Sequence, residues 1–274
     1  SGTLLLSGNN NYSGTTFLGA GDVAVGSDNA FGSSRVYLIG ANLLGYNGPR
    51  QIANEFVLNS NSTYTLGGST TLGGGGNNLT FTGPANIVTI TANQTVTINT
   101  PVAIKVEFAG GIGELMTVGQ NLAKSGFGTL VLSGINTYSG STTVNTNGGA
   151  IVLRDQGSVL NTNGITVNAG GTFVIDNLTG ANLANRVGDI TGITLSGGVL
   201  AYVGKEGAAS TEAVGTVTAN TNTSAAVQVL TSTAGGSTAN LRLGTITRNA
   251  NSTINFVARG RDLSTNEIQT LTIP

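Results

Sequence analysis

Short runs of alternating apolar and polar residues, separated by glycine- and asparagine-rich turns, extend along most of the chain. Val, Ile, Leu and Thr dominate these runs, and such residues favour the pleated, half-buried surface of a β-sheet. In the first part of the chain the pattern predicts strands at 3–7, 15–18, 22–25 and 35–39. The segment 41–54 breaks the alternation and predicts a loop or a short helical turn. The chain is therefore predicted to be all-β.

From residue 128 onward the runs become periodic. Similar segments begin at Gly128, Gly149 and Gly171, which are 21 and 22 residues apart. A repeat of this length with two or three short strands is typical of one coil of a β-solenoid, whose coils bury their apolar faces only by stacking. We therefore predict a right-handed parallel β-helix of about twelve coils. We expect residues 1–274 to form one domain, less regular after about residue 204, with a loop at 207–211.

Turn asparagines offer a second kind of contact between coils. Side-chain amides stack into ladders in other parallel sheets with a strand spacing of about 4.8 Å. We expect such amide ladders at four turn positions, which are Asn10, Asn136, Asn145 and Asn168.

One motif occurs twice. Residues 124–144 read K-S-G-F-G-T-L-V-L-S-G-I-N-T-Y-S-G-S-T-T-V, and residues 2–16 read G-T-L-L-L-S-G-N-N-N-Y-S-G-T-T, offset by 126 residues. The motif resembles the autotransporter-associated β-strand repeat (passenger-associated transport repeat) of secreted and surface-exposed bacterial proteins. The resemblance implies a parallel β-helical passenger, located outside a bacterial cell or on its outer surface, and names no catalytic residue.

Composition narrows the function classes. The chain has 274 residues with 43 Gly, 8% charged residues, and no His, Cys or Trp. Its net charge is −1, and the Lys and Arg residues are scattered, so a nucleic-acid partner is not expected. No apolar run is long enough for a membrane-spanning helix. Because the sequence starts within a repeat motif, we expect a segment of a longer exported precursor.

The ionisable residues do not form a recognisable catalytic pattern. A polysaccharide-cleaving site needs converging carboxylates, and the chain has only 12 acidic residues and no histidine. We interpret each candidate as a solvated pair or a turn residue, and expect no catalytic, metal or cofactor site. These candidates are Asp176, Asp189 with Arg186, Glu206 with Lys205, Asp262 beside Arg261, Asp155 with Arg154, and Glu107 with Lys105.

Thr-x-Thr pairs raise the question of ice binding, which needs such pairs on one flat face at a constant coil spacing. The pairs begin at Thr80, Thr89, Thr95, Thr216 and Thr245. The separations between these pairs are irregular. We therefore interpret the threonines as residues that fill outward strand positions, and not as an ice-binding face.

The ends of the chain suggest self-association. Both are strand-like without a capping segment beside them, and uncapped strand edges can pair between molecules. The candidate self-association residues are Thr3, Leu4, Leu5, Leu6, Ile268, Thr270, Leu271 and Ile273. We therefore expect a non-enzymatic extracellular structural protein whose partner is itself, as a head-to-tail homopolymer. One alternative is an adhesin that binds surface glycans or cells through loops such as 43–50, and a third is a polysaccharide-active enzyme.

Overall fold

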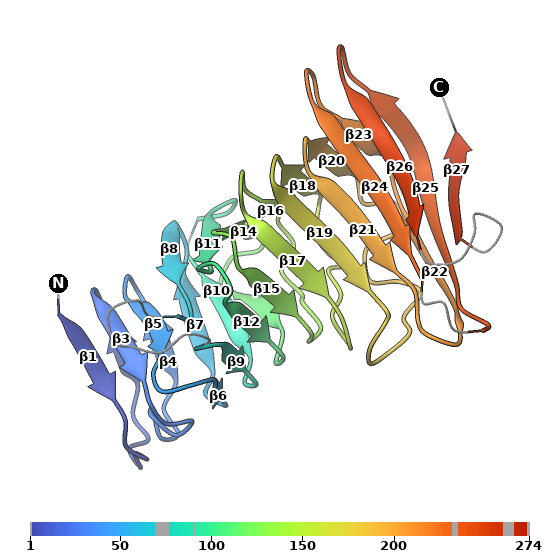
Figure 1. The fold of residues 1–274 in the computed structure, drawn as a ribbon. Coiled ribbons are helices and arrows are strands. Elements are labelled where there is room, and N and C mark those ends of the chain that lie inside the picture. Colours follow the sequence, from blue (N-terminus) through green and yellow to red (C-terminus); the bar gives the residue numbers. More distant parts are fainter. Residues whose placement is uncertain (1, 69–76, 90, 232–234, 260–265, 273–274) are drawn as a thin grey trace.

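The computed structural model describes residues 2–68, 77–89, 91–231, 235–259 and 266–272, the last of these by its backbone only (Figure 1). Within these residues the chain forms twenty-seven strands and no helix. The paired strands are parallel, apart from one isolated antiparallel bridge between Asn168 and Gly197. The predicted parallel β-helix is confirmed.

Successive coils stack their strands into three faces, which run along the length of the molecule (Figure 1). Face 1 consists of β1 (Thr3–Leu6), β3 (Asp22–Val25), β5 (Asn42–Gly45), β8 (Ser62–Thr65), β11 (Thr95–Asn99), β14 (Asn121–Ser125), β16 (Thr142–Val144), β18 (Ile165–Asn168), β20 (Ile193–Ser196), β23 (Val217–Ala219) and the later half of β25 (Thr238–Arg248). Face 2 consists of β6 (Arg50–Ile52), β9 (Leu79–Phe81), β12 (Lys105–Phe108), β15 (Thr129–Leu132), β17 (Gly149–Leu153), β19 (Gly171–Asp176), β21 (Val199–Val203), β24 (Ser224–Leu230) and β26 (Thr253–Arg259). Face 3 consists of β2 (Thr16–Leu18), β4 (Val36–Leu38), β7 (Phe56–Asn59), β10 (Ala85–Val88), β13 (Ile112–Leu115), β22 (Ala209–Val214), the earlier half of β25, and β27 (Asn266–Thr272).

The coils differ in length. Face 1 continues from β5 to β8 through a bridge between Leu43 and Leu66, which gives it eleven strands in the described residues. The predicted number of about twelve coils is therefore not confirmed. Equivalent positions of successive face 1 strands are 20 residues apart at Asn145 and Ser125, but 34 residues apart elsewhere in the stack. Extra residues are accommodated at the corners between faces, so the strands keep their alignment.

The core lies between the three faces. On each strand the alternate inward side chains are buried, as in β19, where Phe173 and Ile175 are buried between half-exposed neighbours. Four buried phenylalanines contact one another in series near the N-terminal end. They are Phe31, Phe56, Phe81 and Phe108, with ring centroids 6.0, 4.8 and 4.7 Å apart along the series. Such contacts add to the apolar area that stacking removes from water.

Face 3 is interrupted between β13 and β22. There the pairing is reduced to isolated bridges from Ile135 to Ser158 and from Val159 to Val187. Buried backbone groups still need partners, and a side chain supplies them. The buried Asn136 accepts a hydrogen bond from the Ile112 N–H at 3.0 Å and donates to the Ser158 carbonyl at 3.0 Å.

Two predicted loops are wrong. The segment 41–54 forms β5 and β6 rather than a loop, because Leu43, Leu44 and Ile52 enter the core. Residues 209–211 begin strand β22, whereas we expected a loop at 207–211.

The four expected amide ladders are also absent. Asn10, Asn136 and Asn168 donate to backbone carbonyls, and Asn145 donates to the Ser125 hydroxyl. Contacts between asparagine amides occur later in the described part of the stack, where Asn249 donates to Asn220, in the same column as Asn145 and Asn168, and Asn251 donates to Asn222.

Candidate functional site

The polar residues of the central repeat copy are buried and hold the coils together. The ammonium group of Lys124 donates to the carbonyls of Ser125, Gly126 and Gly148 at 2.6, 2.7 and 2.9 Å. Burial lowers the pKa of Lys124 to about 7, and these three oxygens oppose that shift. The Tyr138 hydroxyl is fully buried and bonds the Thr142 hydroxyl at 2.7 Å. The motif therefore encodes contacts between coils and not a reactive group.

Within the described residues, β1 is the outermost strand of face 1 at the N-terminal end. β1 pairs on one side with β3, so that Leu4 lies beside Val23, which in turn lies beside Leu43. Val23 and Leu43 are 5% and 0% exposed, whereas Leu4 is 55% exposed. Leu6 packs partly against the core. The predicted self-association residues Thr3, Leu4, Leu5 and Leu6 thus form an exposed, partly apolar edge.

The C-terminal candidates lie at the opposite end of the molecule (Figure 1). Ile268, Thr270 and Leu271 belong to β27, which pairs with β25 on face 3, and Ile273 lies outside the described residues. The structure thus places the two candidate groups on different coils and does not bring them together. Beside β27, strand β26 is poorly covered, with Phe256 43% exposed.

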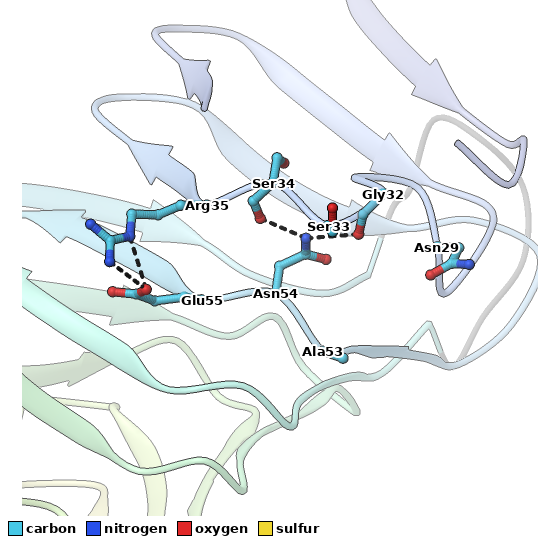
Figure 2. A pocket seen from close by; sticks show the side chains of 8 residues that line it. All are labelled: Asn29, Gly32, Ser33, Ser34, Arg35, Ala53, Asn54 and Glu55. Carbon is cyan, nitrogen blue, oxygen red and sulfur yellow. Dashed lines mark hydrogen bonds and ion pairs between the residues drawn. The ribbon is translucent and has the colours of Figure 1, made fainter. Parts of the chain in front are cut away.

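A hollow of about 360 Å³ lies at the corner that leads into face 3, between the segments 29–35 and 53–55 that precede β4 and β7 (Figure 2). The Arg35 guanidinium donates to the Glu55 carboxylate at 2.8 Å at one side of the hollow. Asn54 crosses between the two coils by donating to the carbonyls of Ser34 at 2.7 Å and Gly32 at 3.1 Å. The hollow therefore has fixed polar walls.

An aromatic pair stands on the same face. Phe17 of β2 lies in register with Tyr37 of β4, with ring centroids 5.0 Å apart, and Phe17 is 64% exposed. The Arg35 guanidinium at the edge of the hollow interacts with the Tyr37 hydroxyl, although neither ring lines the hollow itself. We did not single out these residues from the sequence; the outward positions of 15–18 and 35–39 were the available signal.

The expected binding loop at 43–50 has a different structure. Leu43 and Leu44 are buried in β5, and Arg50 begins β6. The Arg50 guanidinium donates to the carbonyls of Tyr46 and Asn47 at 2.7 and 3.1 Å. The Arg50 guanidinium therefore bonds the backbone of its own segment instead of pointing toward a ligand.

Glu107 is the centre of an ion-pair cluster on face 2. Its carboxylate lies 3.0 Å from the Lys105 ammonium and 2.9 Å from the Arg154 guanidinium, and it accepts a hydrogen bond from Ser133 at 2.8 Å. Burial acts to raise the pKa of Glu107, but the Ser133 hydroxyl and the two cations outweigh it and hold the pKa below its usual value. The group is a stable carboxylate that links three coils.

Arg186 is not the solvated partner of Asp189 that we expected. It is fully buried and donates to the Asn177 side chain at 2.7 Å and to the Gly157 carbonyl at 2.8 Å. The buried Glu212 accepts hydrogen bonds from the backbone N–H groups of Arg186 and Val187. Burial raises the pKa of Glu212 to about 7.

These contacts replace strand hydrogen bonds in the interrupted part of face 3. Sequence reasoning missed them because the partner of Glu212 lies about one coil away and is set by the stacking. Asp176 is the last residue of β19 rather than a turn residue, and its carboxylate accepts a hydrogen bond from the Leu178 N–H in the turn that follows. Asp262 lies outside the described residues.

In the part of the chain that the structure describes, no three metal-binding side chains converge. No described segment is a helix that could cross a membrane.

Comparison with protein families agrees with the repeat analysis. Residues 1–25 and 122–153 match the model of the passenger-associated-transport-repeat family. Both motif copies are thereby confirmed. The matched segments contain β1 and the buried residues Lys124 and Asn136. No curated protein and no solved structure shows a significant match to the chain. The repeat is one of autotransporter passengers, which are secreted or located at the cell surface, and it does not define an enzyme family.

Proposed function

We propose that this chain is a rigid, non-enzymatic structural segment at the surface of a bacterium and that it assembles end to end through its outermost coils. One observation carries the proposal. Leu4 is 55% exposed, whereas Val23 and Leu43, which occupy the same inward position on the next two strands of face 1, are almost fully buried. A further coil stacked on β1 would bury Leu4 in the same way. Burying a leucine side chain contributes about 1.5–3 kcal/mol.

The backbone of β1 supports the same arrangement. An edge strand offers unpaired N–H and C=O groups that another strand can pair with, whatever its side chains. At the other end, β26 offers the partly exposed Phe256 and the half-buried Ile254 as the matching apolar surface. Contact between two different ends of identical chains does not close, and therefore produces a filament. The net charge of −1 provides little repulsion against assembly.

Electron microscopy and sedimentation of the intact chain test this function. We expect filaments from the intact chain and single particles from Leu4→Asp, because burying the unpaired Asp charge against a second copy would cost too much free energy. Removal of residues 1–7, which include β1, should likewise give single particles. Val102→Asp is the matched control, since Val102 is 72% exposed at a corner away from both ends. If the intact chain remains as single particles at high concentration, or Leu4→Asp still forms filaments, the proposal is wrong.

A second candidate function is adhesion through face 3, favoured by the exposed Phe17 ring, which packs on Tyr37 next to the Arg35–Glu55 ion pair. An aromatic face next to fixed hydrogen-bonding groups suits the apolar side of a sugar ring and its hydroxyls. Binding of a glycan array by the intact chain, abolished by Phe17→Ala and unaffected by Ile190→Ala at another exposed site, would support it. Equal binding by both variants would contradict it.

A further inference from the structure

The outward side of face 1 carries a column of threonines. At the same position of eight successive strands, from β8 to β25, seven residues are threonine and one is Ala123. These threonines are Thr63, Thr97, Thr143, Thr166, Thr194, Thr218 and Thr247. We call this column the threonine ladder.

The ladder corrects one expectation from the sequence. The Thr-x-Thr pairs that begin at Thr95, Thr216 and Thr245 do lie on one face, separated by whole coils. Their separations along the chain are irregular because coil length varies from 20 to 34 residues. The pairs at Thr80 and Thr89 lie elsewhere, on β9 and after β10.

The hydroxyl groups of the ladder have no partner within the described residues, and their side chains are exposed or half-exposed. The neighbouring outward column differs, because its side chains bond along the stack. Asn99 donates to Thr65 at 3.1 Å, Asn145 to Ser125 at 2.9 Å, and Asn220 to Ser196 at 3.1 Å. One column is thus internally satisfied and rigid, while the other presents free hydroxyls.

The chemistry of this face excludes several partners. Its outward positions from β8 to β25 hold no ionisable and no aromatic side chain. Nucleic acids require cations, and protein interfaces and sugar rings are typically met by aromatic or arginine side chains. Faces 2 and 3 carry such groups, in the Glu107 cluster and the Arg35–Glu55 pair. A neutral, periodic array of hydroxyl and methyl groups fits a neutral and periodic partner.

We propose that the threonine ladder binds the surface of ice. Its hydroxyls repeat along the stack at the strand spacing of about 4.8 Å, with one gap at Ala123. Thr95, Thr216 and Thr245 add a second hydroxyl about 6.7 Å away along their own strands. Both repeats lie close to oxygen repeats on the faces of hexagonal ice. Threonine has few rotamers because it is β-branched, so the array is largely ordered before binding. Many weak contacts can then act together without a large entropy cost.

Inhibition of ice recrystallisation and thermal hysteresis, measured with the intact chain, test the proposal. Thr166→Tyr combined with Thr194→Tyr places two rings above the middle of the ladder. We expect activity to fall roughly tenfold, because projecting side chains prevent close contact between flat surfaces. The control is Thr172→Tyr at an outward position of β19 on face 2, which should leave activity unchanged. Tyrosine suits strands, and a shared urea midpoint would show that both variants fold.

Three outcomes would overturn the proposal. The first is an intact chain without activity on ice, and the second is a double variant as active as the control. The third is an intact chain that binds crystalline cellulose, with a double variant that loses cellulose binding but keeps its activity on ice. Leu4→Asp should retain ice activity, so failure of end-to-end assembly and failure of ice binding are distinguishable.

Discussion

The side-chain oxygen of Asn136 accepts a hydrogen bond from the backbone N–H of Ile112 at 3.0 Å, one coil earlier in the stack. The amide of the same residue donates to Gly134 and to Ser158, one coil later. One side chain therefore connects three successive coils where face 3 lacks a strand. The equivalent Asn10 in the first repeat copy donates to the Ala30 carbonyl at 2.7 Å. The asparagine of the motif has a structural role in both copies.

Replacing Asn136 should destabilise the central coils. Asn136→Leu keeps the volume but leaves the buried Ile112 N–H without this acceptor and the Gly134 carbonyl without this donor, at a cost of roughly 3 kcal/mol. The urea midpoint measures the effect. Asn145→Leu is the control, since the half-buried Asn145 makes one side-chain hydrogen bond and should cost about 1 kcal/mol. Equal midpoints for the two variants would show that Asn136 does not connect the coils in solution.

Lys124 should make stability depend on alkaline pH. Its pKa is lowered by burial to about 7 in the folded chain, from 10.5. The unfolded chain therefore binds more protons between these values, and stability rises with pH from 7 to 10.5. Urea midpoints across this range should increase in the parent chain, and the increase should be smaller in Lys124→Met. Lys105→Met, at a more exposed lysine, should keep the parent slope.

Glu212 should act in the opposite direction at acidic pH. Burial raises its pKa to about 7 from 4.5, so the folded chain binds the proton more tightly. Its contribution to stability should fall as pH rises from 4.5 to 7. Glu212→Gln still offers an oxygen to the N–H groups of Arg186 and Val187, so it should fold. The urea midpoints of the parent chain and of Glu212→Gln, measured from pH 4.5 to 7, isolate the contribution of this carboxyl group. Midpoints that change in parallel with pH would show that Glu212 does not have a raised pKa.

Gly128 explains the second glycine of the K-x-G-x-G motif. A Cβ there would lie 2.2 Å from the Pro101 carbonyl oxygen and 2.5 Å from that of Ile104. We expect Gly128→Ala to cost roughly 3 kcal/mol, because backbone atoms must move. Gly164→Ala is the control, because a Cβ there meets nothing closer than 3.8 Å. Thermal unfolding of both variants measures the difference, and a tolerated alanine at 128 would show that the coils are less closely packed.

The regular part of the fold was predictable, whereas features that depend on stacking were not. Segments beginning at Gly128, Gly149 and Gly171 repeat at nearly constant spacing, so their strands were evident from the alternation alone. Residues 41–54 were misjudged because strands of three or four residues between turns leave too little alternation to recognise. The threonine ladder was hidden because coils of unequal length place equivalent residues at unequal separations. Burial of Arg186 depends on neighbouring coils that no local pattern specifies.

The parallel pairing along the stack has a mechanical consequence. Hydrogen bonds between coils point along the long axis of the molecule, so tension applied between its ends loads them along their length. At most levels two or three faces share that load, and the buried side chain of Asn136 adds resistance where face 3 lacks a strand, as Lys124 does by bonding the Gly148 carbonyl of the next coil. Because each coil contacts mainly its neighbours, extension beyond the limit would release coils one at a time. A tether built in this way would dissipate force in small steps and could shorten again by rewinding.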